Sequence, residues 1–268
     1  MALLQDALAP LRMDPSGSAV LLDIDGTLSP IVDNAADASV PEATRQLLIA
    51  ISRRFALVAC ISGRRASEAR AMVSIGTICY LGSHGAEMLR AGWTEAVLDP
   101  ALAAWVEPMR ELFRKEDSTE LRRARVRLED KGAIVAFHWR GAQDEDAAKG
   151  LIEAVAARAL ASGLHVHWGR KVMEVRPPVR IDKGDAVIGL IRHSGVRAAV
   201  YVGDDNTDLD AFHALMKLTE SGELQYGLRV GVRSGDGPPE LEAATDLVVD
   251  GTEGVQQLLA SLAAVEPV

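Results

Sequence analysis

The sequence has few cysteines, few aromatic residues and no excess of basic residues. Its two cysteines, Cys60 and Cys79, both stand in apolar runs, so we expect buried free thiols and no disulfide framework. Lys and Arg number 29 against 38 Asp and Glu, a net charge of -9. Because binding a polyanion requires a basic surface, this charge argues against nucleic acid as the main partner. A small phosphorylated ligand stays compatible with it, since a few local cations are enough to bind one.

The chain also lacks long apolar runs. No stretch approaches the roughly 20 residues of a membrane-spanning helix, so we expect no membrane partner. The segment Met1–Asp6 has no basic start and carries an early acid, unlike a signal peptide. These features predict a cytoplasmic protein. The length of 268 residues allows one large or two ordinary domains. The oligomeric state is left open, and a monomer is compatible with the composition.

Short apolar segments alternate with helical patterns at both ends of the chain. We expect strands over residues 19–22, 55–61, 78–81, 198–202, 228–232 and 246–249, separated by helices such as 41–53 and 66–73. Near-continuous apolar strands that alternate with helices indicate a parallel sheet covered on both faces. The predicted fold class is therefore α/β, with a Rossmann-like core built from residues 1–100 and 180–268. Residues 33–37 are expected to form an acidic loop.

The middle of the chain follows a different pattern. A helix is expected over 101–115, then strands over 123–128 and 134–140 joined by a turn at Glu129-Asp130-Lys131-Gly132. A long helix over 144–161 and a strand pair at 165–168 and 172–175 follow. This α+β arrangement predicts an inserted domain at 101–179.

The stretch Asp23-Ile24-Asp25-Gly26-Thr27 follows the first expected strand. Alternate residues of a strand face the same way, and two close carboxylates repel each other unless a cation lies between them. The stretch alone fits either a metal site or a strand followed by a turn. Its place at the carboxyl end of a strand is where open α/β folds bind ligands.

Three more polar groups follow expected core strands or begin a helix. They are Ser62-Gly63-Arg64, Lys183 and the acidic run that contains Asp204, Asp205 and Asp208. Each alone is compatible with an ordinary turn, a solvated helix start or a helix N-terminus. Because the ends of parallel strands meet at one edge of the sheet, together they predict a single site.

The residue types indicate phosphoryl transfer. Clustered carboxylates without His or Cys favour Mg²⁺ over Zn²⁺. A carboxylate beside such a cation can attack phosphorus, and a second carboxylate can protonate the leaving oxygen and then activate water. A lysine and a serine hydroxyl can neutralise the phosphoryl oxygens, where most of the stabilisation lies.

In this order, Asp-x-Asp-Gly-Thr, Ser-Gly-Arg, Lys and Gly-Asp-Asp-x-x-Asp resemble the motifs of the haloacid dehalogenase (HAD) phosphatase superfamily. The resemblance implies Asp23 as nucleophile, Asp25 as general acid/base, and Ser62 and Lys183 as phosphoryl-binding groups. It implies Mg²⁺ held by Asp23, the main-chain carbonyl of Asp25 and Asp204, with Asp208 in support. The inserted domain is similar to the C2-type caps of this superfamily, which close over the substrate.

Several segments also resemble the trehalose-6-phosphate phosphatases. They are Gly82-Ser83-His84-Gly85-Ala86-Glu87, Glu129-Asp130-Lys131-Gly132, His138-Trp139-Arg140 and the run from Gly169 to Pro177. Trp139 stands where that family usually has tyrosine. The spacing to Glu174 favours Lys171 over Arg170 as the family's lysine. The resemblance implies hydrolysis of trehalose 6-phosphate, with sugar contacts from Glu129, Lys131, Arg140, Lys171 and Glu174.

Residues near the domain junction complete the expected substrate site. His84 stands between glycines, where the backbone can approach a ligand, and a structural loop histidine is the alternative. Trp139 and Trp168 could stack on sugar rings or pack in the cap. The chemistry leaves two rivals, a phosphatase for another phosphosugar and a non-catalytic sugar-phosphate-binding domain. The expected substrate-binding set also includes Gly63, Arg64, Gly85 and Asp205.

Overall fold

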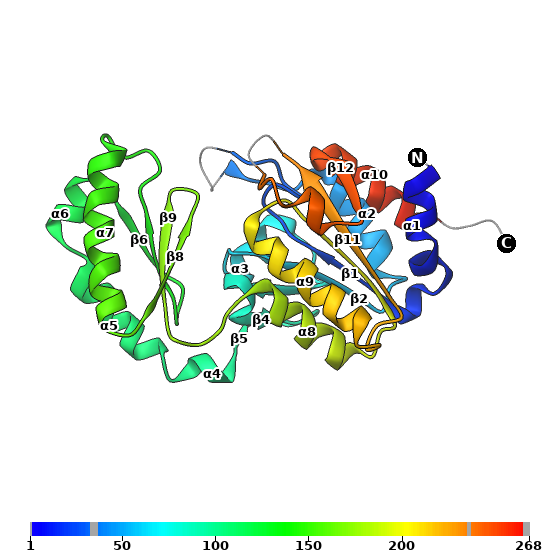
Figure 1. The fold of residues 1–268 in the computed structure, drawn as a ribbon, viewed down its shortest axis with the longest axis horizontal. Coiled ribbons are helices and arrows are strands. Elements are labelled where there is room, and N and C mark those ends of the chain that lie inside the picture. Colours follow the sequence, from blue (N-terminus) through cyan, green and yellow to red (C-terminus); the bar gives the residue numbers. More distant parts are fainter. Residues whose placement is uncertain (1, 33–36, 235–236, 265–268) are drawn as a thin grey trace. The chain divides into compact units, whose positions relative to one another are not determined.

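The chain divides into two compact units, each described by itself below. The larger unit comprises Met1–Val97 and Ile181–Val268, and the inserted unit comprises Leu98–Arg180. The computed structural model describes residues 2–32, 37–234 and 237–264, so most of the predicted acidic loop at 33–37 lies outside the described residues. Figure 1 shows both units as ribbons.

The larger unit is built on an eight-stranded sheet in the order β12-β11-β10-β1-β2-β3-β4-β5. Its first six strands in that order pair in parallel, and β3 pairs with β4 antiparallel. The strands are β1 (Ser18–Leu22), β2 (Leu57–Ile61), β3 (Cys79–Gly82), β4 (Glu87–Leu89), β5 (Val97–Leu98), β10 (Ala198–Gly203), β11 (Tyr226–Arg233) and β12 (Leu247–Asp250). The prediction of a mainly parallel α/β sheet is confirmed.

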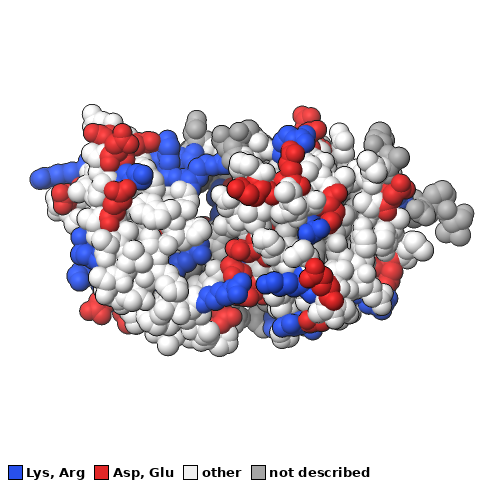
Figure 2. Space-filling view, viewed as in Figure 1, with Lys and Arg blue, Asp and Glu red and all other residues white. Residues whose placement is uncertain are grey.

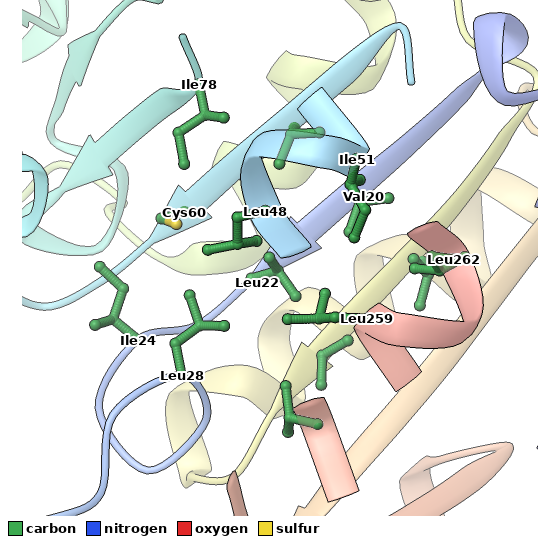
Figure 3. Packing of buried hydrophobic residues seen from close by; sticks show 14 of the residues in the cluster. Val20, Leu22, Ile24, Leu28, Leu48, Ile51, Cys60, Ile78, Leu259 and Leu262 are labelled. Carbon is green, nitrogen blue, oxygen red and sulfur yellow. The ribbon is translucent and has the colours of Figure 1, made fainter. Parts of the chain in front are cut away.

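Helices cover both faces of this sheet because successive residues of each strand point to opposite sides. Val20 and Leu22 pack with helices α1, α2, α3 and α10, as the close-up in Figure 3 shows for α2 and α10. Ala19 and Leu21 pack on the other face against α8 and α9. Burying each such Leu or Val side chain contributes about 1.5–3 kcal/mol. The helices are α1 (Ala2–Met13), α2 (Glu42–Ser52), α3 (Ala66–Val73), α8 (Lys183–Ser194), α9 (Asn206–Glu220) and α10 (Gly251–Ala263), with short 3₁₀ turns at Pro15–Gly17, Ser83–Gly85 and Glu242–Ala244.

The inserted unit is an antiparallel sheet in the order β6-β7-β9-β8, with helices on one face. Phe137 and Met173 point into the core beneath α5 and α7. Residues on the opposite face follow from the register: Glu129 pairs with Ala136, Ala136 with Glu174, and Glu174 with His167. The elements are α4 (Pro100–Ala103), α5 (Val106–Glu116), α6 (Thr119–Arg123), β6 (Arg127–Asp130), β7 (Val135–His138), α7 (Glu145–Ala161), β8 (His165–Gly169) and β9 (Val172–Arg176).

Several predicted element boundaries were wrong. The helix expected over 101–115 is two helices, α4 and α5, which are separated by Ala104 and Trp105. The strand expected from Arg123 begins at Arg127, since Ser118 caps the short helix α6 through the N–H of Leu121. Glu129 and Asp130 belong to β6, and the turn is instead closed by a bond from the Lys131 N–H to the Ile134 carbonyl at 2.9 Å.

The two cysteines are free, with Cys60 buried and Cys79 partly exposed. Burial raises the pKa of the Cys60 thiol, which keeps it protonated and unreactive. Among the described residues, none of the helices combines the length and the hydropathy that crossing a bilayer requires. On the face drawn in Figure 2, acidic and basic side chains are interspersed over both units.

Candidate active site

Three neighbouring strands deliver the polar residues of the site. Strands β10, β1 and β2 lie side by side, and each is followed directly by a polar residue: Asp204, Asp23 and Ser62 respectively. The Asp23 N–H donates to the Val202 carbonyl at 2.9 Å, which continues the sheet pairing up to the carboxylate. These three residues are almost fully buried. The prediction that strand ends would bring these motifs together agrees with this arrangement.

Lys183 links two of the carboxylates. Its ammonium Nζ lies 2.7 Å from Asp23 Oδ1 and 2.7 Å from Asp208 Oδ1, and the side chain is 2% exposed. A cation at the first residue of a helix opposes the helix dipole, so its placement requires these anions. Burial lowers the pKa of Lys183, but the two carboxylates outweigh it and hold that pKa well above its ordinary value. The alternative of a solvated helix start is therefore wrong.

Asp208 is surrounded by donors. Its Oδ1 accepts from Lys183 and from the Tyr201 hydroxyl at 2.6 Å, and its Oδ2 accepts from the N–H groups of Asp204 and Asp205 at 2.9 and 3.0 Å. Asp205 in turn caps helix α9 by accepting from the N–H groups of Thr207 and Asp208. Asp208 thus fixes the loop that carries Asp204 and Asp205.

Asp23, Asp204 and Asp208 form a buried group that could hold a metal ion. One oxygen from each lies within 4.8 Å of the others. Burial raises the pKa of Asp23, as do the neighbouring carboxylates, while Lys183 opposes the rise. A divalent cation would relieve this repulsion, and an all-oxygen donor set suits a hard cation. Gly26 leaves room for the Asp204 carboxylate, because an added Cβ would lie 2.1 Å from Asp204 Oδ2.

Asp25 points away from this group. Its two oxygens accept from Arg64, Oδ2 from Nε at 2.7 Å and Oδ1 from Nη2 at 2.7 Å. The paired carboxylates of Asp-x-Asp therefore diverge: Asp23 contacts Lys183 and Asp25 contacts Arg64. The Asp25 carboxylate is absent from the three-carboxylate group just described. Arg64 binds both oxygens of Asp25 in this structure, and its contact with substrate stays a prediction.

The loop after β3 is strained and lies beside Ser62. His84 and Ser83 have left-handed φ angles of 60° and 50°, which are uncommon for residues other than glycine. The His84 N–H donates to the Ser62 carbonyl at 2.9 Å, and the His84 ring lies so close to Gly63 that an added Cβ would lie 2.9 Å from it. Gly85, with φ 110°, packs against helix α8 at Ala186. The structure therefore brings His84 and Gly63 together.

Charged residues of the inserted unit form two separate groups. In the first, Glu174 accepts from Lys131 Nζ at 3.0 Å and from Arg176 Nε and Nη2 at 2.9 and 2.6 Å, and all three side chains are mostly buried. On the same face, Glu129 Oε2 lies 2.7 Å from His138 Nε2. Burial raises the pKa of Glu129, but the His138 bond and Lys131 outweigh it and hold the pKa below its usual value.

Arg140 and Lys171 lie apart from that group. Lys171 pairs with Glu145 at the start of α7 at 2.8 Å, and both side chains are exposed. Arg140 Nη2 lies 3.4 Å from the Arg170 carbonyl. Trp139 and Trp168 pack edge to face nearby, with ring centroids 6.0 Å apart. The five predicted sugar-binding residues therefore do not form one cluster within the inserted unit.

Sequence reasoning missed three contributors, Tyr201, His138 and Arg176. Tyr201 carries the only hydroxyl in the otherwise apolar strand Ala198–Gly203, and a buried tyrosine hydroxyl usually has a partner. Arg176 stands two residues after Glu174, on the same face of β9. His138 stood in the segment His138-Trp139-Arg140 without a role of its own. The partners of all three residues could be identified only from the fold.

Comparisons with known proteins identify the family of this chain. The family model of trehalose-phosphatase matches residues 21–244. The chain belongs to the trehalose-phosphatase family. The match takes in parts of both halves of the larger unit and the whole inserted unit between them, and it includes every residue of the candidate active site.

Individual relatives of this family member are moderately similar to it. A trehalose-phosphate phosphatase of Mycobacterium avium is 35% identical over 235 residues, which cover 84% of this chain and 57% of that protein. An uncharacterized glycosyl hydrolase of Mycobacterium tuberculosis is 35% identical over 214 residues, 74% of this chain and 15% of that protein. The C-terminal domain of a Candida albicans trehalose-6-phosphate phosphatase has the same fold, with a TM-score of 0.74 at 21% identity over 97% of this chain and 96% of that one. The chain thus spans 57% or less of the length of these two curated relatives.

Proposed function

We propose that the protein is a Mg²⁺-dependent phosphatase that hydrolyses trehalose 6-phosphate to trehalose and phosphate. The observation that carries the proposal is the buried cluster in which Lys183 bridges Asp23 and Asp208 beside Asp204. The trehalose-phosphatase family match, which covers all of these residues, supports the substrate. That combination supports both the activity and the substrate.

The metal is proposed to bind to Asp23 and Asp204, with the main-chain carbonyl of Asp25 as a further ligand. Asp208 is assigned a supporting place, because its oxygens already accept four hydrogen bonds. When bound, Mg²⁺ neutralises charge on the phosphoryl group and on the clustered carboxylates. Its expected effect on Asp23 is to restore the ionised form that a nucleophile needs.

Asp23 is proposed to attack phosphorus and to form an aspartyl-phosphate. Ser62, which follows β2, and Lys183, which begins α8 and contacts Asp23, are suited to bind the phosphoryl oxygens. Asp25 is proposed to protonate the leaving sugar oxygen and then to take a proton from the attacking water. Arg64 orients Asp25 through its two-bond contact, and contact of Gly63, His84, Gly85 and Asp205 with substrate remains part of the proposal.

The inserted unit is proposed to be the cap that recognises the sugar. Glu129, Lys131 and Glu174 lie near one another on its helix-free face, where carboxylates and an ammonium can bond sugar hydroxyls. Arg140 and Lys171 would contact the substrate from a separate position. Since Lys171 is held by Glu145, a change of partner is required before it can do so.

A substrate panel tests the proposal. Phosphate release from trehalose 6-phosphate, glucose 6-phosphate, sucrose 6-phosphate and mannosylglycerate phosphate is measured with and without Mg²⁺. We expect Mg²⁺-dependent turnover that is fastest for trehalose 6-phosphate. Glucose 6-phosphate turning over equally well would refute the substrate assignment. Binding of trehalose 6-phosphate without any turnover would instead support a non-catalytic binding domain.

A further inference from the structure

Tyr201 is a buried tyrosine that points at the catalytic cluster from inside the sheet. It lies in the middle of β10, is fully buried, and its ring packs edge to face on Phe212 with centroids 5.6 Å apart. Phenylalanine would fill the same space. The hydroxyl therefore needs a separate explanation, and its bond to Asp208 Oδ1 at 2.6 Å supplies one.

That hydroxyl completes the set of donors around Asp208. A carboxylate offers about four acceptor positions, and Asp208 uses them for Tyr201, Lys183 and two backbone N–H groups. The backbone bonds hold Oδ2 and thereby direct Oδ1 toward Lys183. Tyr201 and Lys183 then both donate to Asp208 Oδ1. The bond from the Tyr201 hydroxyl therefore weakens the attraction of this oxygen for the Lys183 ammonium.

The consequence concerns the position of the Lys183 ammonium, which is equally distant from Asp208 and Asp23. Without the Tyr201 hydroxyl, Lys183 would be the one side-chain donor left to Asp208 Oδ1. The negative charge of Asp208 would then draw the Lys183 ammonium away from Asp23. We propose that Tyr201 is a positioning residue that, through Asp208, keeps Lys183 at Asp23. This inference rests on the proposed phosphatase function.

Tyr80 provides a matched control. It is also fully buried, lies in β3 of the same sheet, and donates its hydroxyl to the Ile75 carbonyl at 2.6 Å. Its bond is to backbone and involves no carboxylate. Tyr201→Phe and Tyr80→Phe therefore remove the same buried hydroxyl and keep the same ring, at two places that differ in their relation to Lys183.

The first readout is steady-state hydrolysis of trehalose 6-phosphate at saturating Mg²⁺. We expect Tyr201→Phe to lower kcat about tenfold with little change in KM, because a misplaced lysine acts on the reacting phosphoryl group. Tyr80→Phe is expected to keep kcat within about twofold of the wild type. Thermal unfolding of both variants measures the loss of stability that removing any buried hydrogen bond causes.

The second readout needs no turnover. Calorimetry measures how beryllium trifluoride, an analogue of a phosphoryl group on Asp23, binds in the presence of Mg²⁺. We expect Tyr201→Phe to bind it about fivefold more weakly and Tyr80→Phe to bind it like the wild type. The inference would be overturned if kcat and the affinity for the analogue fell equally in the two variants, or if both were unchanged in Tyr201→Phe. A wild type that does not bind the analogue would also overturn it. A wild type that binds it but releases no phosphate would refute the proposed function alone.

Discussion

The buried charges of the two units are organised in opposite ways. In the larger unit, oxygens of Asp23, Asp204 and Asp208 lie within 4.8 Å of one another, and Lys183 pairs with two of the three carboxylates. In the inserted unit, the two carboxylates Glu174 and Glu129 lie beside two cations: Lys131 and Arg176 pair with Glu174, and Lys131 also lowers the pKa of Glu129. In the first arrangement the negative charges outnumber the positive one, which favours binding of a cation. In the second arrangement the charges are balanced. The difference fits the proposed function, in which the larger unit carries out the reaction and the inserted unit binds the sugar.

The strongest way to break this contrast is to remove the nucleophile. Asp23→Asn should lower phosphate release by at least about a thousandfold, since an amide cannot form the aspartyl-phosphate. The matched control is Asp246→Asn, which loses an ion pair with Arg229 at 2.5 Å in the same unit. That control should stay active. Retained phosphate release by Asp23→Asn would contradict the assignment of the nucleophile.

The balanced network should instead contribute to stability. Lys131→Met should cost about 3 kcal/mol in the free energy of unfolding, the low end for breaking a buried ion pair, because Arg176 still neutralises Glu174. Lys171→Met, which breaks an exposed pair with Glu145, should cost below about 1 kcal/mol. Tryptophan fluorescence during urea unfolding mainly follows this unit, which contains three of the four tryptophans of the chain, Trp105, Trp139 and Trp168. If both variants lost the same free energy of unfolding, the buried pair would be no more stabilising than the exposed one, which would contradict this prediction.

A cation should stabilise the three-carboxylate group. After treatment with a chelator, added Mg²⁺ at a hundred times its Kd should raise the free energy of unfolding by about 2.7 kcal/mol. The rise in melting temperature should vanish in Asp204→Asn. It should persist in Asp14→Asn, which removes a surface carboxylate that pairs with Arg197. A Mg²⁺ effect that survives in Asp204→Asn would place the cation elsewhere.

The smallest effect concerns Glu129 and pH. Its pKa is held below the usual 4.5, after burial is outweighed by the His138 bond and by Lys131. A depressed pKa contributes stability that is present above pH 4.5 and is lost as the pH falls through the lower folded value. Glu129→Gln should therefore melt below the wild type at pH 7, by an amount worth below about 1 kcal/mol, and the difference should shrink toward pH 3. A difference that is independent of pH would contradict this.

The sequence predicted the sheet and the convergence of the strand ends well. Apolar strands and the topology of parallel sheets determine both, so Asp23, Ser62 and Asp204 could be placed from their spacing alone. Which side chain contacts which could not be predicted. Arg64 and Asp25 are 39 positions apart, and their contact depends on where two loops end. Likewise the spacing of Lys171 to Glu174 gave no sign of the ion pair that Lys171 forms with Glu145.

The specificity ratio between two substrates tests the division of work between the units most directly. It is kcat/KM for trehalose 6-phosphate divided by kcat/KM for glucose 6-phosphate, measured in the wild type and in Glu129→Gln. The account predicts a wild-type ratio of at least about ten, which falls toward one in the variant while glucose 6-phosphate hydrolysis is unchanged. A wild-type ratio near one, or a ratio that the variant leaves intact, would contradict it.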